Sequence, residues 1–216
     1  MTDAGGRSGD HVELVDARDV ADLATFLSRA RRLDAAEVRL QATGRVLAAT
    51  VCALAGHGLM GEGTVLGLRA VALAKEATCD VVVGIDAVHD RLARLRAAAE
   101  AEPSRENVPQ RLALPPVPVV VPWTGVAPPR AGWEPIGVLP GAVVERAAED
   151  GIAEIAAART EQVRESVWGR TIPGTSVPAG SALAVHALGF TAPEIAVFAC
   201  GRWHRLSTPA GHVLAR

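Results

Sequence analysis

Apolar residues recur every three or four positions along several stretches of the chain, which is the pattern of amphipathic helices. The first such helix follows a strand candidate at residues 12–15, and Asp16 can cap it by accepting hydrogen bonds from free backbone N–H groups. Its apolar stripe consists of Val20, Leu23, Leu27 and Ala30. The same spacing predicts helices at 87–101 and 179–188, and a long helix at 142–168 that bends at Gly151.

Alternation of apolar and polar residues predicts two β-hairpins with similar sequences. Residues 39–48 read RLQATGRVLA, and residues 205–215 read RLSTPAGHVLA with a longer turn. A turn at Thr43 and Gly44 places the apolar residues of the first hairpin on one face: Val38, Leu40, Leu47 and Ala49. Each hairpin follows a helix-like stretch, so the pattern suggests two related halves.

Three further apolar runs predict strands. Residues 64–75 are almost uniformly apolar and favour a buried strand, although a helix also fits a short apolar run. Residues 80–83 and 195–205 predict two more strands. The predicted fold class is therefore α+β, with antiparallel sheets built from hairpins, packed helices and two related halves.

Proline content divides the chain. Most of its 14 prolines lie between residues 102 and 140, where they exclude a continuous helix or a central strand. We expect a disordered leader at 1–10, an N-terminal α+β half at 11–101, a Pro-rich connector at 102–140 and a C-terminal helix-plus-hairpin half at 141–216. Within the connector, residues 117–121 can form an edge strand, and Trp123 and Trp133 are expected to pack on the core. Its PxxP-like spacing also allows docking into an aromatic groove.

Composition and charge exclude several classes of protein. Hydrophobic residues make up 49% of the chain, which excludes global disorder. The net charge is −2, which argues against a strongly basic nucleic-acid binder. Three widely spaced cysteines without a CxxC motif indicate reduced thiols in a cytoplasmic protein. No segment has the ~20 apolar residues of a membrane span, so no membrane partner is expected.

The sharpest short motif is the GxGxxG pattern at residues 56–61. Gly56, Gly58 and Gly61 are its glycines, and they would bind a dinucleotide by allowing close backbone approach to a pyrophosphate at a helix N-terminus. The alternative is a plain Gly-rich connection, because the preceding strand reads as a hairpin arm and the next run reads as a strand. We therefore predict no cofactor.

No set of residues predicts a catalytic or metal site. The six histidines include no HExxH pattern and no metal-binding cluster. A four-residue turn would place Ser207 opposite His212 in the second hairpin, but the sequence has no GxSxG elbow to complete a hydrolase. The sequence leaves open whether the chain is an enzyme, and the lack of such a set of residues favours a non-catalytic protein.

The C-terminal hairpin is the predicted contact surface. After Glu194 the chain has arginines, histidines and a tryptophan but no acidic residue. The candidate contact residues are Arg202, Trp203, His204, Arg205, His212 and Arg216. A basic hairpin with an aromatic ring can lie against a nucleic-acid backbone. The alternative is an ordinary sheet with solvated arginines and a core tryptophan.

Three segments resemble an uncharacterised family of actinobacterial cytosolic proteins. They are residues 132–137 (GWEPIG), residues 167–170 (VWGR) and residues 201–206 (GRWHRL) with 211–214 (GHVL). The resemblance covers most of the chain beyond residue 11 and implies a bacterial, cytoplasmic protein. The order of elements over residues 12–101 is also similar to one domain of a DNA sliding clamp, whose pore helices are basic; Arg91, Arg94 and Arg96 could supply such charges.

These observations lead to three functional hypotheses. The first is a non-catalytic, self-associating interaction or regulatory protein, which forms a homo-oligomer and can bind a protein partner. The second is an enzyme that binds a nucleotide or small molecule at residues 56–61. The third is weak nucleic-acid binding by the C-terminal hairpin.

Overall fold

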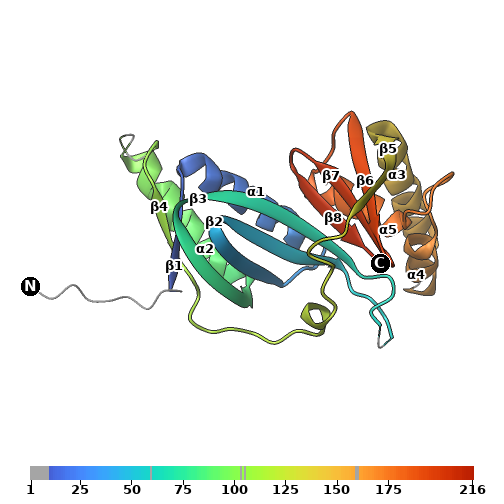
Figure 1. Ribbon diagram of the computed structural model, residues 1–216, viewed down its shortest axis with the longest axis horizontal. Coiled ribbons are helices and arrows are strands. Elements are labelled where there is room, and N and C mark those ends of the chain that lie inside the picture. Colours follow the sequence, from blue (N-terminus) through green and yellow to red (C-terminus); the bar gives the residue numbers. More distant parts are fainter. Residues whose placement is uncertain (1–9, 59, 103, 105, 159–160) are drawn as a thin grey trace, which may run out of the picture. The chain divides into compact units, whose positions relative to one another are not determined.

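The protein is described here by a computed structural model that covers residues 10–58, 60–102, 104, 106–158 and 161–216 (Figure 1). It divides into two compact units. Unit 1 comprises residues 1–31, 35–50 and 69–120, and unit 2 comprises residues 32–34, 51–68 and 121–216. Strands β2 (Glu37–Leu54) and β3 (Val65–Gly84) contribute residues to both units.

Unit 1 packs two helices with antiparallel strands. Strand β1 (His11–Leu14) pairs with β3 and with β4 (Gln110–Ala113), and helix α1 (Ala17–Arg31) packs on α2 (Ile85–Ala101). The predicted cap is confirmed, because Asp16 Oδ1 accepts hydrogen bonds from the backbone N–H groups of Arg18 (2.8 Å) and Asp19 (3.2 Å). The whole predicted stripe of α1 is buried.

The first predicted hairpin is wrong, because β2 runs straight through the expected turn. Gly44 has a φ of +59°, which marks a β-bulge inside one strand. Beyond it, Arg45 still lies along β3, donating to the carbonyl oxygens of Leu73 (3.3 Å) and Ala74 (2.8 Å). A bulge and a two-residue turn both shift the alternation by one position, so the pattern could not distinguish them.

Strand β3 settles the ambiguity at residues 64–75 in favour of a strand. It also joins two elements that the sequence separated, because the predicted strand at 80–83 is its continuation. On its side toward β2, Asp80 accepts hydrogen bonds from Arg39 and Gln41 at 2.8–3.0 Å. Helix α2 follows β3 without a loop, close to the predicted range.

Unit 2 contains a longer antiparallel sheet. The first part of β3 pairs with β8 (Gly211–Ala215), followed in order by β7 (Trp203–Thr208), β6 (Glu194–Cys200) and β5 (Glu134–Pro140). The second predicted hairpin is confirmed as β7 and β8. The predicted strand at 195–205 is wrong, because Gly201 (φ +57°) and Arg202 form a turn between β6 and β7.

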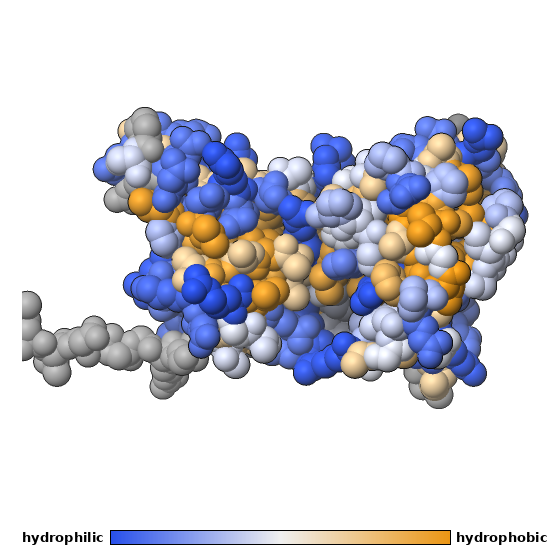
Figure 2. Space-filling model, turned by 45° about the horizontal axis from the view of Figure 1, so that its top comes forward, coloured by the Kyte–Doolittle hydropathy of each residue, from blue (hydrophilic) through white to orange (hydrophobic). Residues whose placement is uncertain are grey.

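Strand β5 is the outer strand of this sheet and lies within the predicted connector. Its prolines, Pro135 and Pro140, are tolerated because an edge strand needs fewer ladder donors. Figure 2 shows hydrophobic residues in both the left-hand and the right-hand part of the view, and Figure 1 draws β5 and α3 (Gly141–Ala158) in the right-hand part. Residues 117–121 do not form a strand, and a 3-10 turn, η2 (Pro122–Gly125), follows them.

The predicted long helix is two helices, α3 and α4 (Glu161–Gly169), and α3 packs on α5 (Ala179–Leu188). Helix α3 continues through Gly151. A Cβ there would lie 2.6 Å from Cη2 of Trp168, so glycine leaves room for the tryptophan ring. The predicted end of α5 is confirmed, because Gly189 has a φ of +69°.

The fold class is confirmed: the protein is α+β, with antiparallel strand pairing, packed helices and two halves. The predicted boundaries at 101 and 141 stay a prediction, and the two compact units differ from them because β2 and β3 are shared. The leader at 1–10 lies outside the described residues except for Asp10. In the described part of the chain, no helix has the length and apolar character to cross a membrane.

Candidate contact surface on the sheet of unit 2

The sheet of unit 2 has two different faces. Along β7, alternate side chains point to opposite sides, so Trp203, Arg205 and Ser207 lie on one face and His204 on the other. Trp203 packs with Leu66 and Leu214, and Trp123, Val126 and Trp133 of the connector cover the same cluster. We call this side of the sheet the connector face.

The two connector tryptophans pack on the core as predicted. The indole N–H of Trp133 donates to the carbonyl oxygen of Pro129 at 3.0 Å, which fixes the ring over the sheet. Trp203 is only 4% exposed, so its ring is a core residue. This is the position that the alternative of an ordinary sheet with a core tryptophan expects.

Arg205 is held on the connector face by aromatic rings. Its guanidinium carbon lies 5.0 Å from the ring centre of Trp133 and 4.3 Å from that of Phe198. Burial lowers the pKa of Arg205, and its buried Nε has no hydrogen-bond partner among the described residues. Ring contacts of this kind stabilise a cation by about 0.5–2 kcal/mol, so Arg205 is a fixed positive charge beside apolar surface.

His212 lies near this cation. Its Nδ1 and the Ser207 hydroxyl are joined by a hydrogen bond of 2.9 Å, as the predicted pairing of the two residues requires. Burial lowers the pKa of His212, and the charge of Arg205 lowers it further. His212 is therefore neutral at pH 7, and the positive charge of this patch belongs to Arg205.

The remaining arginines differ in their surroundings. Arg202 forms an exposed ion pair with Glu62 at 3.6 Å, so the loop between β2 and β3 supplies the acid that the C-terminal hairpin lacks. Arg216 continues the sheet, because its N–H donates to Thr64 and its carbonyl accepts from Gly63, both at 3.0 Å. Arg202 is therefore exposed, as the alternative of solvated arginines expects, while the contacts of Arg216 are made by its backbone.

His204 lies on the opposite face, toward the loop between α4 and α5. Its Nε2 and the Ser176 hydroxyl are 3.0 Å apart, and burial lowers its pKa. This pair has the spacing of a nucleophile and its base, but His204 Nδ1 is buried with no partner in the described chain. A base needs an orienting group on that nitrogen, so the arrangement is an incomplete triad.

The GxGxxG segment connects β2 to β3. His57 and Glu62 pair their backbones across the loop at 2.8 and 3.0 Å, and Gly58 and Gly61 have φ values of +65° and +64°. A Cβ at Gly56 would lie 2.6 Å from the carbonyl oxygen of Gly61. These glycines therefore close a tight turn. The loop leads into a strand, so the helix N-terminus of the dinucleotide mechanism does not follow it.

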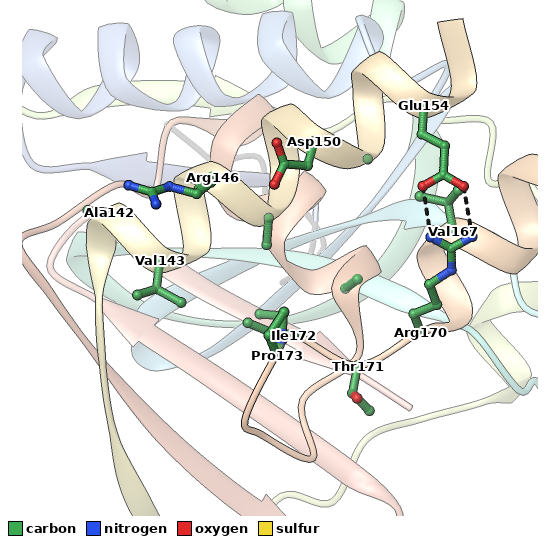
Figure 3. A pocket seen from close by; sticks show the side chains of 13 residues that line it. Ala142, Val143, Arg146, Asp150, Glu154, Val167, Arg170, Thr171, Ile172 and Pro173 are labelled. Atoms are coloured by element: carbon green, nitrogen blue, oxygen red, sulfur yellow. Dashed lines mark hydrogen bonds and ion pairs between the residues drawn. The ribbon is translucent and has the colours of Figure 1, made fainter. Parts of the chain in front are cut away.

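A cavity beside α3 was missed by the sequence reasoning (Figure 3). It has a volume of about 390 Å³, and its lining comes from α3, from Val167 and from residues 170–173 with Ala179. Figure 3 shows Ile172 and Pro173 in the middle of the view, Val143 at the left and the Glu154–Arg170 pair at the right. No motif marks it, because its residues come together only through the packing of α3 and α4.

The described residues contain no group of three or more metal-ligating side chains. The cysteines Cys52, Cys79 and Cys200 are free thiols, and burial raises the pKa of Cys79.

Two family models match separate parts of the chain. Residues 8–111 match the model described as Domain of unknown function (DUF8010), and residues 128–216 match the one described as Domain of unknown function (DUF8185). The comparison with curated proteins finds no match. The expectation of an uncharacterised family is thus confirmed.

Solved structures with a similar fold include DNA polymerase sliding clamps. The clamp from Caulobacter crescentus is 10% identical, with a TM-score of 0.55, over 95% of this chain and 64% of that chain. A putative DNA polymerase III beta subunit from Eubacterium rectale is 8% identical, with a TM-score of 0.54, over 96% and 65%. The clamp from Pseudomonas aeruginosa is 12% identical, with a TM-score of 0.50, over 95% and 63%.

The chain spans less than two thirds of the length of each of these clamps. At this identity the likeness shows the fold alone. It extends well beyond the predicted range of 12–101, because it also covers the C-terminal half. Residues 8–111 and 128–216 thus match models of domains of unknown function, and the fold of the chain is similar to that of sliding clamps.

Proposed function

We propose that this protein is a non-catalytic, self-associating interaction protein. The observation that carries the proposal is strand β5, an exposed edge of the sheet of unit 2 that has apolar side chains. It pairs with β6 on one side, and its other side ends the sheet. Unpaired backbone groups on an edge strand are a template for pairing with a second chain.

The side chains of β5 support this. Ile136 is 50% exposed and Val138 is 58% exposed. Edge strands of monomeric proteins are commonly protected by charged side chains, prolines or bulges, and Glu134 is the only charged residue of β5. The prolines at 135 and 140 and the register shift between Pro135 and Gly137 limit pairing toward the ends of β5, so the N–H groups left to pair are those of residues 136–139 that point away from β6. A second copy would cover both the apolar side chains and the open backbone.

The fold supports a role in binding. The similar structures include DNA polymerase sliding clamps, and the Ser176–His204 pair lacks an orienting group. We further propose that Arg205 and His212 on the connector face contact a partner, because Arg205 is a fixed cation that no described carboxylate pairs with. Free thiols support a reducing compartment such as the bacterial cytoplasm.

Sedimentation velocity over a range of protein concentrations tests self-association. We expect the wild-type sedimentation coefficient to rise with concentration, and the Ile136→Lys/Val138→Lys variant to stay monomeric because two charges oppose edge pairing. Val108→Lys is the matched control, since Val108 is 42% exposed and lies outside the sheets. A strictly monomeric wild type would refute the proposal.

A further inference from the structure

The side chain of Arg205 reaches from β7 across the neighbouring strand β6. Its guanidinium carbon lies 4.3 Å from the ring centre of Phe198, the residue that pairs with Arg205 on β6, and 5.0 Å from that of Trp133, which directly precedes β5. A guanidinium group that contacts two rings is held in place before any partner arrives. The charge of Arg205 is therefore fixed at one point of the connector face.

No acidic side chain of the described residues neutralises this charge, and Arg205 Nε is buried without a hydrogen-bond partner. Strands β5 and β6 have one glutamate each. Glu134 pairs with Ala199, which pairs with His204, so it lies on the opposite face. Glu194 is four residues from Phe198 along β6, which is about 13 Å in a strand. A partly buried cation without a counter-charge is unfavourable, so a carboxylate from outside would stabilise it.

The free donors of Arg205 favour a carboxylate over other anions. Nε is buried, but neither terminal nitrogen is among the buried atoms without a partner, so the two terminal N–H groups stay open. Such a pair matches the two oxygens of a planar carboxylate. Burial and the charge of Arg205 lower the pKa of His212, which is neutral at pH 7, and Arg216 follows β8, two strands from β6. The site over β6 thus has one positive charge, which one carboxylate neutralises.

Apolar side chains lie next to the cation on the same face. Strand register forms a row across five strands, beside the row that contains Phe198 and Arg205; its members are Val138, Ala196, Ser207, His212 and Leu68. Val138 is 58% exposed, and the other four residues of the row are half-buried. The connector packs on Leu66, Trp203 and Leu214 instead. The row can therefore contact apolar side chains on either side of a bound carboxylate.

We propose that Arg205 binds the carboxylate of an aspartate or glutamate side chain in a partner protein, through two parallel hydrogen bonds from its terminal nitrogens. Apolar neighbours of that acidic residue lie on the row from Val138 to Leu68. The inference rests on the proposed role of the connector face in binding, and it names the chemical group that this face recognises. An open sheet face suits a protein segment better than a small organic acid, which binds in a concave site. The contact uses side chains of the face and leaves the backbone edge of β5 free.

A titration with two capped peptides, followed by NMR on the isotope-labelled full chain, tests the carboxylate. The probes are acetyl-Leu-Glu-Leu-amide and acetyl-Leu-Gln-Leu-amide, which have nearly the same shape and differ by one charge. We expect the glutamate peptide to shift the indole N–H signal of Trp133 in a saturable way, and the glutamine peptide to bind about fivefold more weakly. Arg205→Gln and Arg205→Lys should both lose this preference, because lysine lacks the planar fork. Arg202→Gln removes an arginine from the adjacent turn and is the matched control, which should bind like the wild type.

Equal binding of the two peptides to the wild type overturns the inference, and this comparison does not depend on the folding of any variant. An unchanged preference in Arg205→Gln overturns it as well. Sodium phosphate is the third probe, and binding at Arg205 as tight as that of the glutamate peptide would overturn a protein side chain as the occupant.

Sedimentation velocity of Arg205→Gln separates this contact from self-association. We expect the variant to associate like the wild type, because the edge of β5 is unchanged. Loss of association in Arg205→Gln would overturn a separate partner, since the carboxylate would then come from a second copy. A monomeric wild type refutes the proposed self-association, and the peptide titration still judges Arg205.

Discussion

At the scale of single residues, sequence rules that consider only neighbouring residues correctly predicted where two helices begin or end. Asp16 caps α1 and Gly189 ends α5 because a cap depends on its own side chain or φ angle and on the adjacent turn. The roles of Gly151 and Arg205 could not be predicted in this way. Each depends on a ring from a distant part of the sequence, Trp168 or Trp133.

Gly151→Ala is expected to destabilise the protein. Alanine in a helix normally adds about 0.5–1 kcal/mol of stability relative to glycine. At Gly151 the added Cβ would lie 2.6 Å from Cη2 of Trp168, and Trp168 is 7% exposed, so it has little room to move. We expect a net loss of about 1–3 kcal/mol in the free energy of unfolding, measured with urea.

Gly169→Ala is the control for this experiment. It lies at the end of α4, with no heavy atom within 4 Å of the added Cβ. We expect its stability to equal or exceed that of the wild type. Equal stability of the two variants would contradict the close packing assigned to Gly151.

His204 and His212 are expected to make stability depend on pH. Burial lowers the pKa of both in the folded protein from the ordinary value of 6.5, and Arg205 adds to the effect at His212. The unfolded chain therefore binds more protons below pH 6.5, and the free energy of unfolding falls as the pH falls through that value. Above it, this contribution is fully present.

Urea unfolding at pH 8, 6.5 and 5.5 measures this dependence. The difference between the wild type and a His204→Gln/His212→Gln variant isolates the two histidines from other titrating groups. We expect the variant to lose less stability than the wild type between pH 8 and 5.5. If the free energy of unfolding falls equally in the wild type and the variant, the two imidazoles do not cause the pH dependence.

At the scale of elements, the sequence predicted which segments are helices and strands better than it predicted how these elements are connected. Periodicity within each segment was enough to predict the α+β class, α1, α2 and the second hairpin. The first hairpin was wrong because Gly44 shifts the alternation of β2 just as a turn would. The strand at 195–205 was wrong because Gly201 and Arg202 turn the chain without interrupting its apolar pattern.

The bulge can be tested at Gly44. Its φ of +59° disfavours other residues, although a Cβ there would meet no atom within 4 Å. We expect Gly44→Ala to lower the free energy of unfolding by about 1–2 kcal/mol through backbone strain alone. Gly44→Asn should lose less, since asparagine adopts this conformation more readily. Equal losses for both variants would argue against a left-handed bulge.

At the scale of the whole molecule, the candidate contact surface was located by the sequence only in part. Composition drew attention to the C-terminal hairpin, but alternation along β7 separates His204 from Arg205. The cavity beside α3 and the edge position of β5 depend on how distant elements pack, which no local pattern records.

The charges of the C-terminal hairpin do not favour nucleic-acid binding. The net charge is −2, Arg202 pairs with Glu62, and Arg205 is stacked between rings. We therefore expect no electrophoretic mobility shift of duplex DNA at about 150 mM salt. Binding that weakens steeply with salt and is lost in Arg205→Ala would contradict this, because phosphate contacts release counterions.

The central claim is that β5 is where copies of this protein associate. Hydrogen–deuterium exchange of residues 136–139, measured at low and high protein concentration, tests it most directly. We expect those amides among them that point away from β6 to exchange more slowly at high concentration, because a second chain accepts their hydrogen bonds, while amides of α2 exchange at an unchanged rate. Exchange in β5 that is independent of concentration, in a sample that does associate, would contradict the claim.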